Sequence, residues 1–145
     1  MALERFATHF NYEPMVFDAA DPQGVPIYHA NVLMCIATDF CLVGFDTLTD
    51  PQRRAEIHAR LAQSGREVVA LSQAQIADFA GNAIELSGRD GRLLALSARA
   101  EACLSAAQKQ VIARYAHTVP LAVPTIEQAG GSVRCMLAGI HLARR

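Results

Sequence analysis

The stretch Glu127-Gln128-Ala129-Gly130-Gly131-Ser132-Val133-Arg134-Cys135-Met136 decides how the rest of the chain is interpreted. A glycine pair leads into a short apolar segment that carries a cysteine, and we predict a strand there. Two earlier stretches, residues 28–33 (YHANVL) and 79–84 (FAGNAI), share this layout. When the three are aligned on Asn31, Asn82 and Ser132, the copies stand 51 and 50 residues apart. A regular period of this size is typical of a repeat architecture, so the chain is predicted to hold about two and a half copies of one unit.

Each unit is predicted to run strand, strand, helix, strand and capped turn. In the first unit Asp50 caps a helix, Pro51 takes its first position and Gly65 follows its end. Hydrogen-bonding side chains three residues apart predict further helix starts. These capping boxes are Ser72 with Gln75, Ser105 with Gln108, and Thr125 with Gln128.

Apolar runs bounded by turn residues predict the strands, and apolar spacing predicts the helices. The predicted strands are residues 15–17, 31–36, 40–45, 67–71, 82–86, 92–96, 117–123 and 132–142. The predicted helices are residues 1–10, the segment that Asp50 caps, and residues 106 to about 116, with a hairpin turn at residues 88–91. The alternation indicates an α/β fold.

Composition excludes several classes of protein. The chain has 145 residues, of which 52% are hydrophobic and 19% charged, with a net charge of −1. Such a chain is globular and forms a single domain or part of one, and it offers no basic surface for nucleic acid or an anionic membrane. No apolar run approaches the ~20 residues of a membrane span, and the N-terminus does not resemble a signal peptide. Four cysteines without metal-site spacing then favour a cytoplasmic protein with reduced thiols.

Two residues at equivalent places in the repeats carry reactive side chains. Cys135 lies at the glycine-flanked entry of the third unit, and His29 lies at the entry of the first. If the units are related by a pseudo-rotation, the two side chains converge on one axis as a nucleophile and a general base. The alternatives are a cysteine buried as a small hydrophobic residue and a structural histidine.

Three stretches carry a resemblance to a known family: residues 17–29, residues 29–36 (HANVLMCI) and residues 130–136 (GGSVRCM). They resemble the C-terminal part of the amidinotransferase and guanidine-modifying superfamily, in its arginine-deiminase-related branch, which includes citrulline-utilisation hydrolases. The resemblance extends from about Tyr12 to Leu142. It implies that residues 1–145 are the C-terminal portion of one pseudo-fivefold αβ-propeller, a pentein-type ring of five αβ units with the active site on its axis.

The resemblance also implies a chemistry. Cys135 is the nucleophile that attacks the central carbon of a guanidino or ureido group, and His29 is the general acid and base. Ammonia or an amine leaves, and water then hydrolyses the covalent thio-intermediate. No metal or organic cofactor is required, and the partner is a small-molecule substrate.

Five further residues are candidates for substrate binding. Asn31 and Asn82 are equivalent positions of two units and are expected to line the axis. Asp18 and Asp21 belong to a segment that lies near the substrate in the family, although a strand-end charge and a turn cap explain them equally well. Arg134 suits a substrate carboxylate, and a structural or solvent-facing role is the alternative.

Two features separate this sequence from the family pattern. Asn31 stands where arginine deiminases have aspartate, and an amide lacks the negative charge that favours a guanidinium, so a neutral ureido substrate such as citrulline is the hypothesis. The family chain is also roughly twice as long. The alternative function is therefore a catalytically incomplete fragment or assembly subunit, completed by self-association or by an N-terminal half.

Overall fold

The computed structural model of the chain describes residues 2–140. The first unit contains helix α2 (Ala30–Leu33), strands β1 (Met34–Ile36) and β2 (Phe40–Val43), the 3₁₀ helix η1 (Phe45–Thr47), helix α3 (Pro51–Gln63), strand β3 (Glu67–Ala70) and helix α4 (Gln73–Ala77). Strand β2 lies in the middle of a three-stranded sheet, antiparallel to β1 and parallel to β3.

The second unit repeats this topology. It contains strands β4 (Ile84–Gly88) and β5 (Gly91–Ser97), helices α5 (Ala98–Cys103) and α6 (Ala106–Ala113), strand β6 (His117–Leu121) and helix α7 (Pro124–Gln128). Strand β5 is antiparallel to β4 and parallel to β6. A 3₁₀ helix, η2 (Val133–Met136), follows. The predicted α/β repeat of about 50 residues is therefore present twice, whereas a closed propeller is not seen in residues 2–140.

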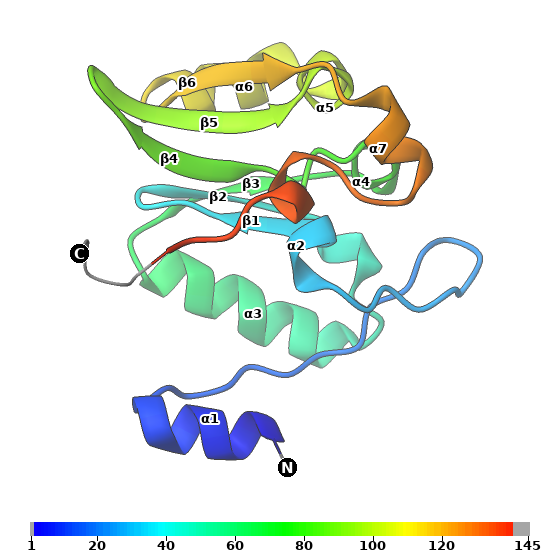
Figure 1. Cartoon of the computed structure of the whole chain (residues 1–145). Coiled ribbons are helices and arrows are strands. Elements are labelled where there is room, and N and C mark those ends of the chain that lie inside the picture. Colours follow the sequence, from blue (N-terminus) through cyan, green and yellow to red (C-terminus); the bar gives the residue numbers. More distant parts are fainter. Residues whose placement is uncertain (1, 141–145) are drawn as a thin grey trace.

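The two sheets lie next to each other, and their helices lie on the outer sides (Figure 1). Helix α3 covers the first sheet, and α5 and α6 cover the second. The core between these layers is built from fully buried aliphatic and aromatic side chains, among them Leu33, Phe40, Leu42, Leu94, Leu96 and Ile112. The ring of Phe40 stacks on Tyr115 with centroids 5.9 Å apart, which joins the first sheet to the helix layer of the second unit.

The capping glutamines of α4 and α6 also join the two units. Gln75 Nε2 donates to Gln108 Oε1 at 2.7 Å, and Gln108 Nε2 donates to Gln75 Oε1 at 3.2 Å. Each glutamine also makes its capping-box contact with Ser72 or Ser105. The same side chains therefore cap two helices and hold the units together.

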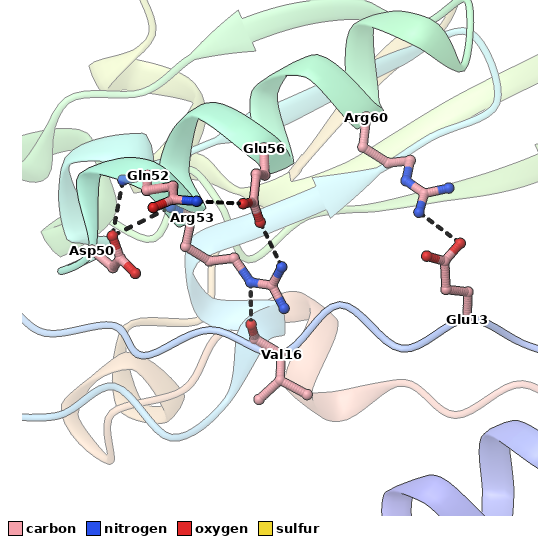
Figure 2. Close-up of polar contacts among 7 residues, drawn as sticks. All are labelled: Glu13, Val16, Asp50, Gln52, Arg53, Glu56 and Arg60. Atoms are coloured by element: carbon pink, nitrogen blue, oxygen red, sulfur yellow. Dashed lines mark hydrogen bonds and ion pairs between the residues drawn. The ribbon is translucent and has the colours of Figure 1, made fainter.

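The N-terminal segment is tied to α3 by polar contacts. Helix α1 (Ala2–Phe10) lies outside α3, and a stretch without regular structure leads from it toward the first unit (Figure 1). Along this stretch Arg60 pairs with Glu13 at 2.6 Å, and Arg53 Nε donates to the Val16 carbonyl at 2.7 Å (Figure 2). Asp50 caps α3 through the amides of Gln52 and Arg53, as the sequence predicts.

The predicted strand at residues 132–142 is wrong for the part that the structure describes. Residues 133–136 form η2, residues 137–140 have no regular structure, and residues 141–142 lie outside the described range. Within residues 2–140 no strand pairs with this segment. Two of its backbone amides are satisfied locally instead, from Cys135 to the Ser132 carbonyl and from Leu137 to the Arg134 carbonyl.

Other predicted boundaries also need correction. The first strands of the two units begin at Met34 and Ile84, because residues 30–33 form a helical turn and residues 81–83 a bend. Residues 15–17 form no strand. Helix α7 begins at Pro124 with no side-chain cap, so Thr125 is inside it and the third capping box is absent. Helix α5, capped by Ser97, was not predicted.

None of the described helices is long and apolar enough to cross a membrane.

Gly81 permits the closest approach between the two units. A Cβ atom built at Gly81 would lie 2.7 Å from both the Leu33 carbonyl carbon and the Val32 carbonyl oxygen. Both are backbone atoms and cannot rotate away. Glycine at this position therefore sets how near the entry of β4 comes to α2.

We expect Gly81→Ala to lower the free energy of unfolding by about 2 kcal/mol or more, as for other overpacking substitutions. The check is the midpoint of urea unfolding followed by circular dichroism. Gln110→Ala, an exposed change on α6, is the control, because it leaves the packing between the units unchanged. A Gly81→Ala protein as stable as the Gln110→Ala protein would contradict the packing argument.

Candidate functional site

Cys135 lies on η2, which crosses from one sheet to the other next to α2 (Figure 1). The glycine pair forms the turn that leads into η2. Gly130 has φ +85, a left-handed conformation that favours glycine. A Cβ at Gly131 would lie 3.3 Å from Cys135 Cβ and 3.4 Å from its sulfur. Cys135 is exposed, so it is not the buried hydrophobic residue that its apolar surroundings in sequence allow.

Asn82 connects Cys135 to the first unit. Its side chain is fully buried, and its Nδ2 donates to the Asn31 carbonyl at 2.7 Å and to Cys135 Sγ at 3.1 Å. The Arg134 amide in turn donates to the Asn82 carbonyl at 3.3 Å. Asn82 thus links Asn31, the equivalent position of the first unit, to the segment that carries Cys135. The Asn82 N–H therefore holds the Cys135 sulfur in a defined position.

Asn31 also faces the cysteine. Its Nδ2 lies 3.9 Å from Cys135 Sγ, a long contact even for sulfur. Its Oδ1 is buried with no hydrogen-bond donor among the described residues, and the same is true of Asn82 Oδ1. Buried acceptors without donors are rare in folded proteins, so these two amide oxygens are exceptions.

His29 lies two residues before Asn31 and precedes α2. It is exposed, and its side chain makes no hydrogen bond or ion pair with the described part of the chain. The structure therefore places Asn31 and Asn82 at the sulfur of Cys135 but shows no such contact for His29. The general-base role of His29 stays a prediction.

The two aspartates differ in their surroundings. Asp21 Oδ1 accepts from the amides of Gln23 and Val25 at 2.9 and 2.8 Å, which is the turn-cap role. Asp21 also lines a cavity of about 610 Å³, the loop cavity, together with α4, Phe79 and Gly130. Asp18 is exposed and uses its backbone carbonyl to hold Thr49. Neither carboxylate contacts Cys135.

Arg134 lines a second cavity of about 360 Å³ between β1 and the start of β4, which we call the strand cavity. Asn31 lines it too, so the strand cavity adjoins the cysteine. The Arg134 side chain is half-buried, and its Nη1 donates to the Leu137 carbonyl at 3.1 Å. The guanidinium keeps other donors for a ligand.

Sequence reasoning missed Glu85, which lies on β4 and also lines the strand cavity. The available signal was a carboxylate inside a short apolar strand, three residues after Asn82. Within residues 2–140, no group of three or more His, Cys, Asp or Glu side chains could hold a metal ion.

The remaining cysteines are unsuited to nucleophilic chemistry. Cys35 and Cys41 are buried in the core, as their apolar surroundings predict. Burial, followed by the nearby Glu85 charge, raises the pKa of Cys35 to about 12. Burial raises the pKa of Cys41 to about 11 and also raises that of the half-buried Cys103.

A sequence model of the family described as "N,N dimethylarginine dimethylhydrolase, eukaryotic" matches residues 1–142. The chain belongs to this dimethylarginine dimethylhydrolase family. The resemblance to guanidine-modifying enzymes drawn from residues 17–36 and 130–136 is thereby confirmed. No curated protein sequence shows significant similarity to the chain.

Solved structures match the fold of this dimethylarginine dimethylhydrolase family member. The product-bound N-terminal domain of ArgZ, an arginine dihydrolase from the ornithine-ammonia cycle in cyanobacteria, matches with a TM-score of 0.69 and 16% identity, over 92% of this chain and 44% of that chain. Unliganded AgrE matches with a TM-score of 0.60 and 20% identity, over 81% of this chain and 15% of that chain. At these identities the likeness shows the fold alone, and the chain spans less than half the length of these proteins.

The exposure of Cys135 and the raised pKa values of the other thiols predict selective alkylation. At pH 7 we expect iodoacetamide to modify Cys135 well before Cys35 or Cys41, because groups with pKa values of about 12 and 11 remain protonated there. Their reactivity should appear only as the pH rises toward these values. Peptide mapping by mass spectrometry measures the order of labelling.

Replacing Asn82 tests how its hydrogen bond to Cys135 Sγ affects the reactivity of the thiol. Asn82→Ala should slow alkylation of Cys135 several-fold, since it deletes the hydrogen bond that holds the sulfur in position. Gln110→Ala, an exposed change on α6, is the control. An unchanged rate in a folded Asn82→Ala protein would show that the contact does not activate the thiol.

Proposed function

We propose that the chain carries the cysteine part of a hydrolase that cleaves a C–N bond of a guanidino or ureido compound. One observation carries this proposal: an exposed Cys135 receives the Nδ2 donor of a fully buried asparagine. A purely structural cysteine would be buried and would not need an ordered donor at its sulfur. Family membership adds that related proteins act on dimethylarginine.

The reaction begins with the Cys135 thiolate attacking the central carbon of the substrate group. The tetrahedral adduct collapses, the C–N bond breaks, and the leaving nitrogen takes a proton from His29 as ammonia or an amine. Water, deprotonated by His29, then adds to the same carbon and displaces the thiolate. A guanidino substrate is thereby converted to a ureido product with one water consumed.

The neighbouring residues are assigned supporting roles. Asn82 holds the sulfur and stabilises its negative charge, and Asn31 presents its free Oδ1 to the substrate nitrogens. Arg134 offers its remaining donors to a substrate carboxylate. Asp21 lines the loop cavity and Asp18 lies in the preceding loop, where either could meet the amino group of the substrate.

The names of solved relatives are compatible with this proposal. An AgrE variant with one cysteine replaced by alanine was solved with L-arginine. An ArgZ N-terminal domain variant was solved covalently bound to a reaction intermediate. We further propose that the two ββαβ units and η2 form part of a pentein-type propeller whose other units face β1 and β4.

The test is ammonia release from L-arginine and L-citrulline. We expect turnover to be lost in Cys135→Ala and to fall at least about a hundredfold in His29→Ala, the usual size of a general acid–base contribution. Cys103→Ala, which changes another incompletely buried cysteine, should retain activity. A folded chain that releases no ammonia from either compound, or a Cys135→Ala protein that remains active, would contradict the proposal.

A second candidate is a catalytically incomplete subunit that is active only after assembly. Apolar side chains on the first strands favour it: Ile36 on β1 is 47% exposed and Leu86 on β4 is 39% exposed. Other exposed apolar side chains lie beside η2, at Met136 and Leu137. Such a surface is typical of a contact with further units.

If the chain assembles with itself, it should elute as a dimer or larger species at micromolar concentration. Light scattering coupled to size-exclusion chromatography measures this. Leu86→Glu should shift the protein toward monomer, whereas Leu3→Glu, on the outlying α1, should not. Elution of the wild-type chain as a monomer would exclude self-association as the route to a complete site.

A further inference from the structure

The turn that leads to Cys135 contains two successive glycines. Helix α7 ends at Gln128, and Ala129, Gly130 and Gly131 connect it to η2 (Figure 1). Glycine has more backbone freedom than any other residue, so the backbone of this turn alone fixes the start of η2 weakly. A side-chain contact across the turn therefore decides how well the cysteine is placed.

One side-chain hydrogen bond closes this turn. Ser132 is fully buried, and its hydroxyl donates to Oε1 of Glu127 on α7 at 3.1 Å. On the other side of the turn, the Cys135 amide donates to the Ser132 carbonyl at 3.1 Å. Ser132 is therefore held by Glu127 through its side chain, and it holds Cys135 through its backbone.

The Glu127 carboxylate is committed to this contact. The residue is half-buried and forms no ion pair with another residue in the range 2–140. A hydrogen bond to an ionised carboxylate is roughly twice as strong as one between neutral groups. The buried Ser132 hydroxyl would lose its acceptor if Glu127 were removed, and buried polar groups without a partner are costly. The pair is thus a strong local contact at the base of the cysteine segment.

The equivalent position of the second unit holds the sulfur directly. Asn82 aligns with Ser132, is also fully buried, and donates to Cys135 Sγ. Five residues before Asn82 stands Ala77, which has no side-chain acceptor, whereas Glu127 stands five residues before Ser132. The third unit therefore has a side-chain contact that the second lacks. Asn82 fixes the sulfur, and the contact in the third unit fixes the backbone that carries it.

We propose that Glu127 is a positioning residue for the nucleophile. By accepting from the Ser132 hydroxyl, it holds residues 128–135 so that Cys135 Sγ stays within reach of the Asn82 amide. This role requires an acceptor oxygen and does not require a negative charge. A carboxylate that binds a substrate cation would depend on its charge instead. The inference rests on the proposed function, because it takes Cys135 as the reacting group.

Amide hydrogen exchange measured by NMR tests the positioning without turnover. In Glu127→Ala we expect the Cys135 amide to exchange about fivefold to tenfold faster, because its acceptor on Ser132 is no longer held in place. The Leu71 amide, which donates to the Val43 carbonyl in the first sheet, should keep its exchange rate. Equal acceleration of the two amides would mean a general loss of stability and would overturn the inference.

Glu127→Gln is the matched rescue, because glutamine keeps an oxygen that accepts from the Ser132 hydroxyl. Its Cys135 amide should exchange within about twofold of the wild-type rate. Ser132→Ala should reproduce Glu127→Ala, and the double variant should exchange no faster than either single variant, since all three lack the same hydrogen bond. Glu101→Ala, which removes an ion pair with Lys109 on the outer helix layer, is the control and should leave the rate unchanged.

Ammonia release gives the second readout. We expect kcat to fall about tenfold in Glu127→Ala with KM changed by less than about twofold, and Glu127→Gln to keep the wild-type kcat. If Glu127→Ala fails to fold, Ser132→Ala supports the same comparison. A Glu127→Gln protein as impaired as Glu127→Ala, or additive effects of the two alanine variants, would overturn the inference. The exchange rates do not depend on turnover, so a chain that releases no ammonia contradicts the hydrolase proposal and leaves the test of positioning intact.

Discussion

The hydrogen bonds of the Asn82 amide are the constraint on which the rest of the structure depends. One buried NH₂ group holds the carbonyl of the first unit and the sulfur of the third segment. It can do so only because Gly81 lets β4 approach the backbone of α2. Removing this buried donor takes a hydrogen bond from the Asn31 carbonyl and another from the Cys135 sulfur, and an unpaired polar group is most costly where it is buried. The hydrogen bonds of Asn82 therefore stabilise both the packing of the units and the candidate site.

Local signals in the sequence predicted local structure well. Asp50, Pro51 and Gly65 define helix α3, and the serine–glutamine pairs begin α4 and α6, because capping involves residues within one turn. Residues 132–140 behaved differently. Whether an apolar segment becomes a strand depends on pairing elsewhere in the fold, and no strand within residues 2–140 pairs with this one. Thr125 matched a capping pattern, yet Pro124 already occupies the first helical turn.

The candidate site was partly predictable for a related reason. Alignment of the repeats singles out Asn31, Asn82 and the segment of Cys135, and the structure brings their side chains together. Residues at equivalent positions of neighbouring repeats lie close together when the repeats pack against each other. In the repeat alignment Glu85 takes the position of Met34 and Cys135, so the other units carry no carboxylate there. One of its carboxylate oxygens is buried without a donor among the described residues, and only three-dimensional coordinates contain that information. The orientation of the His29 imidazole is likewise beyond the reach of a sequence pattern.

The paired capping glutamines have a consequence for how the molecule unfolds. Gln75 caps the start of α4, and Gln108 caps the start of α6. Each side chain also hydrogen-bonds the other across the two units. In most repeat proteins, helix ends fray independently, and the units melt in succession along the array. Here, fraying of α4 would withdraw a donor from α6, so local opening in one unit raises the free energy of its neighbour. The two units are thus coupled at their periphery as well as at Asn82, and hydrogen exchange at both helix starts should report one common opening event.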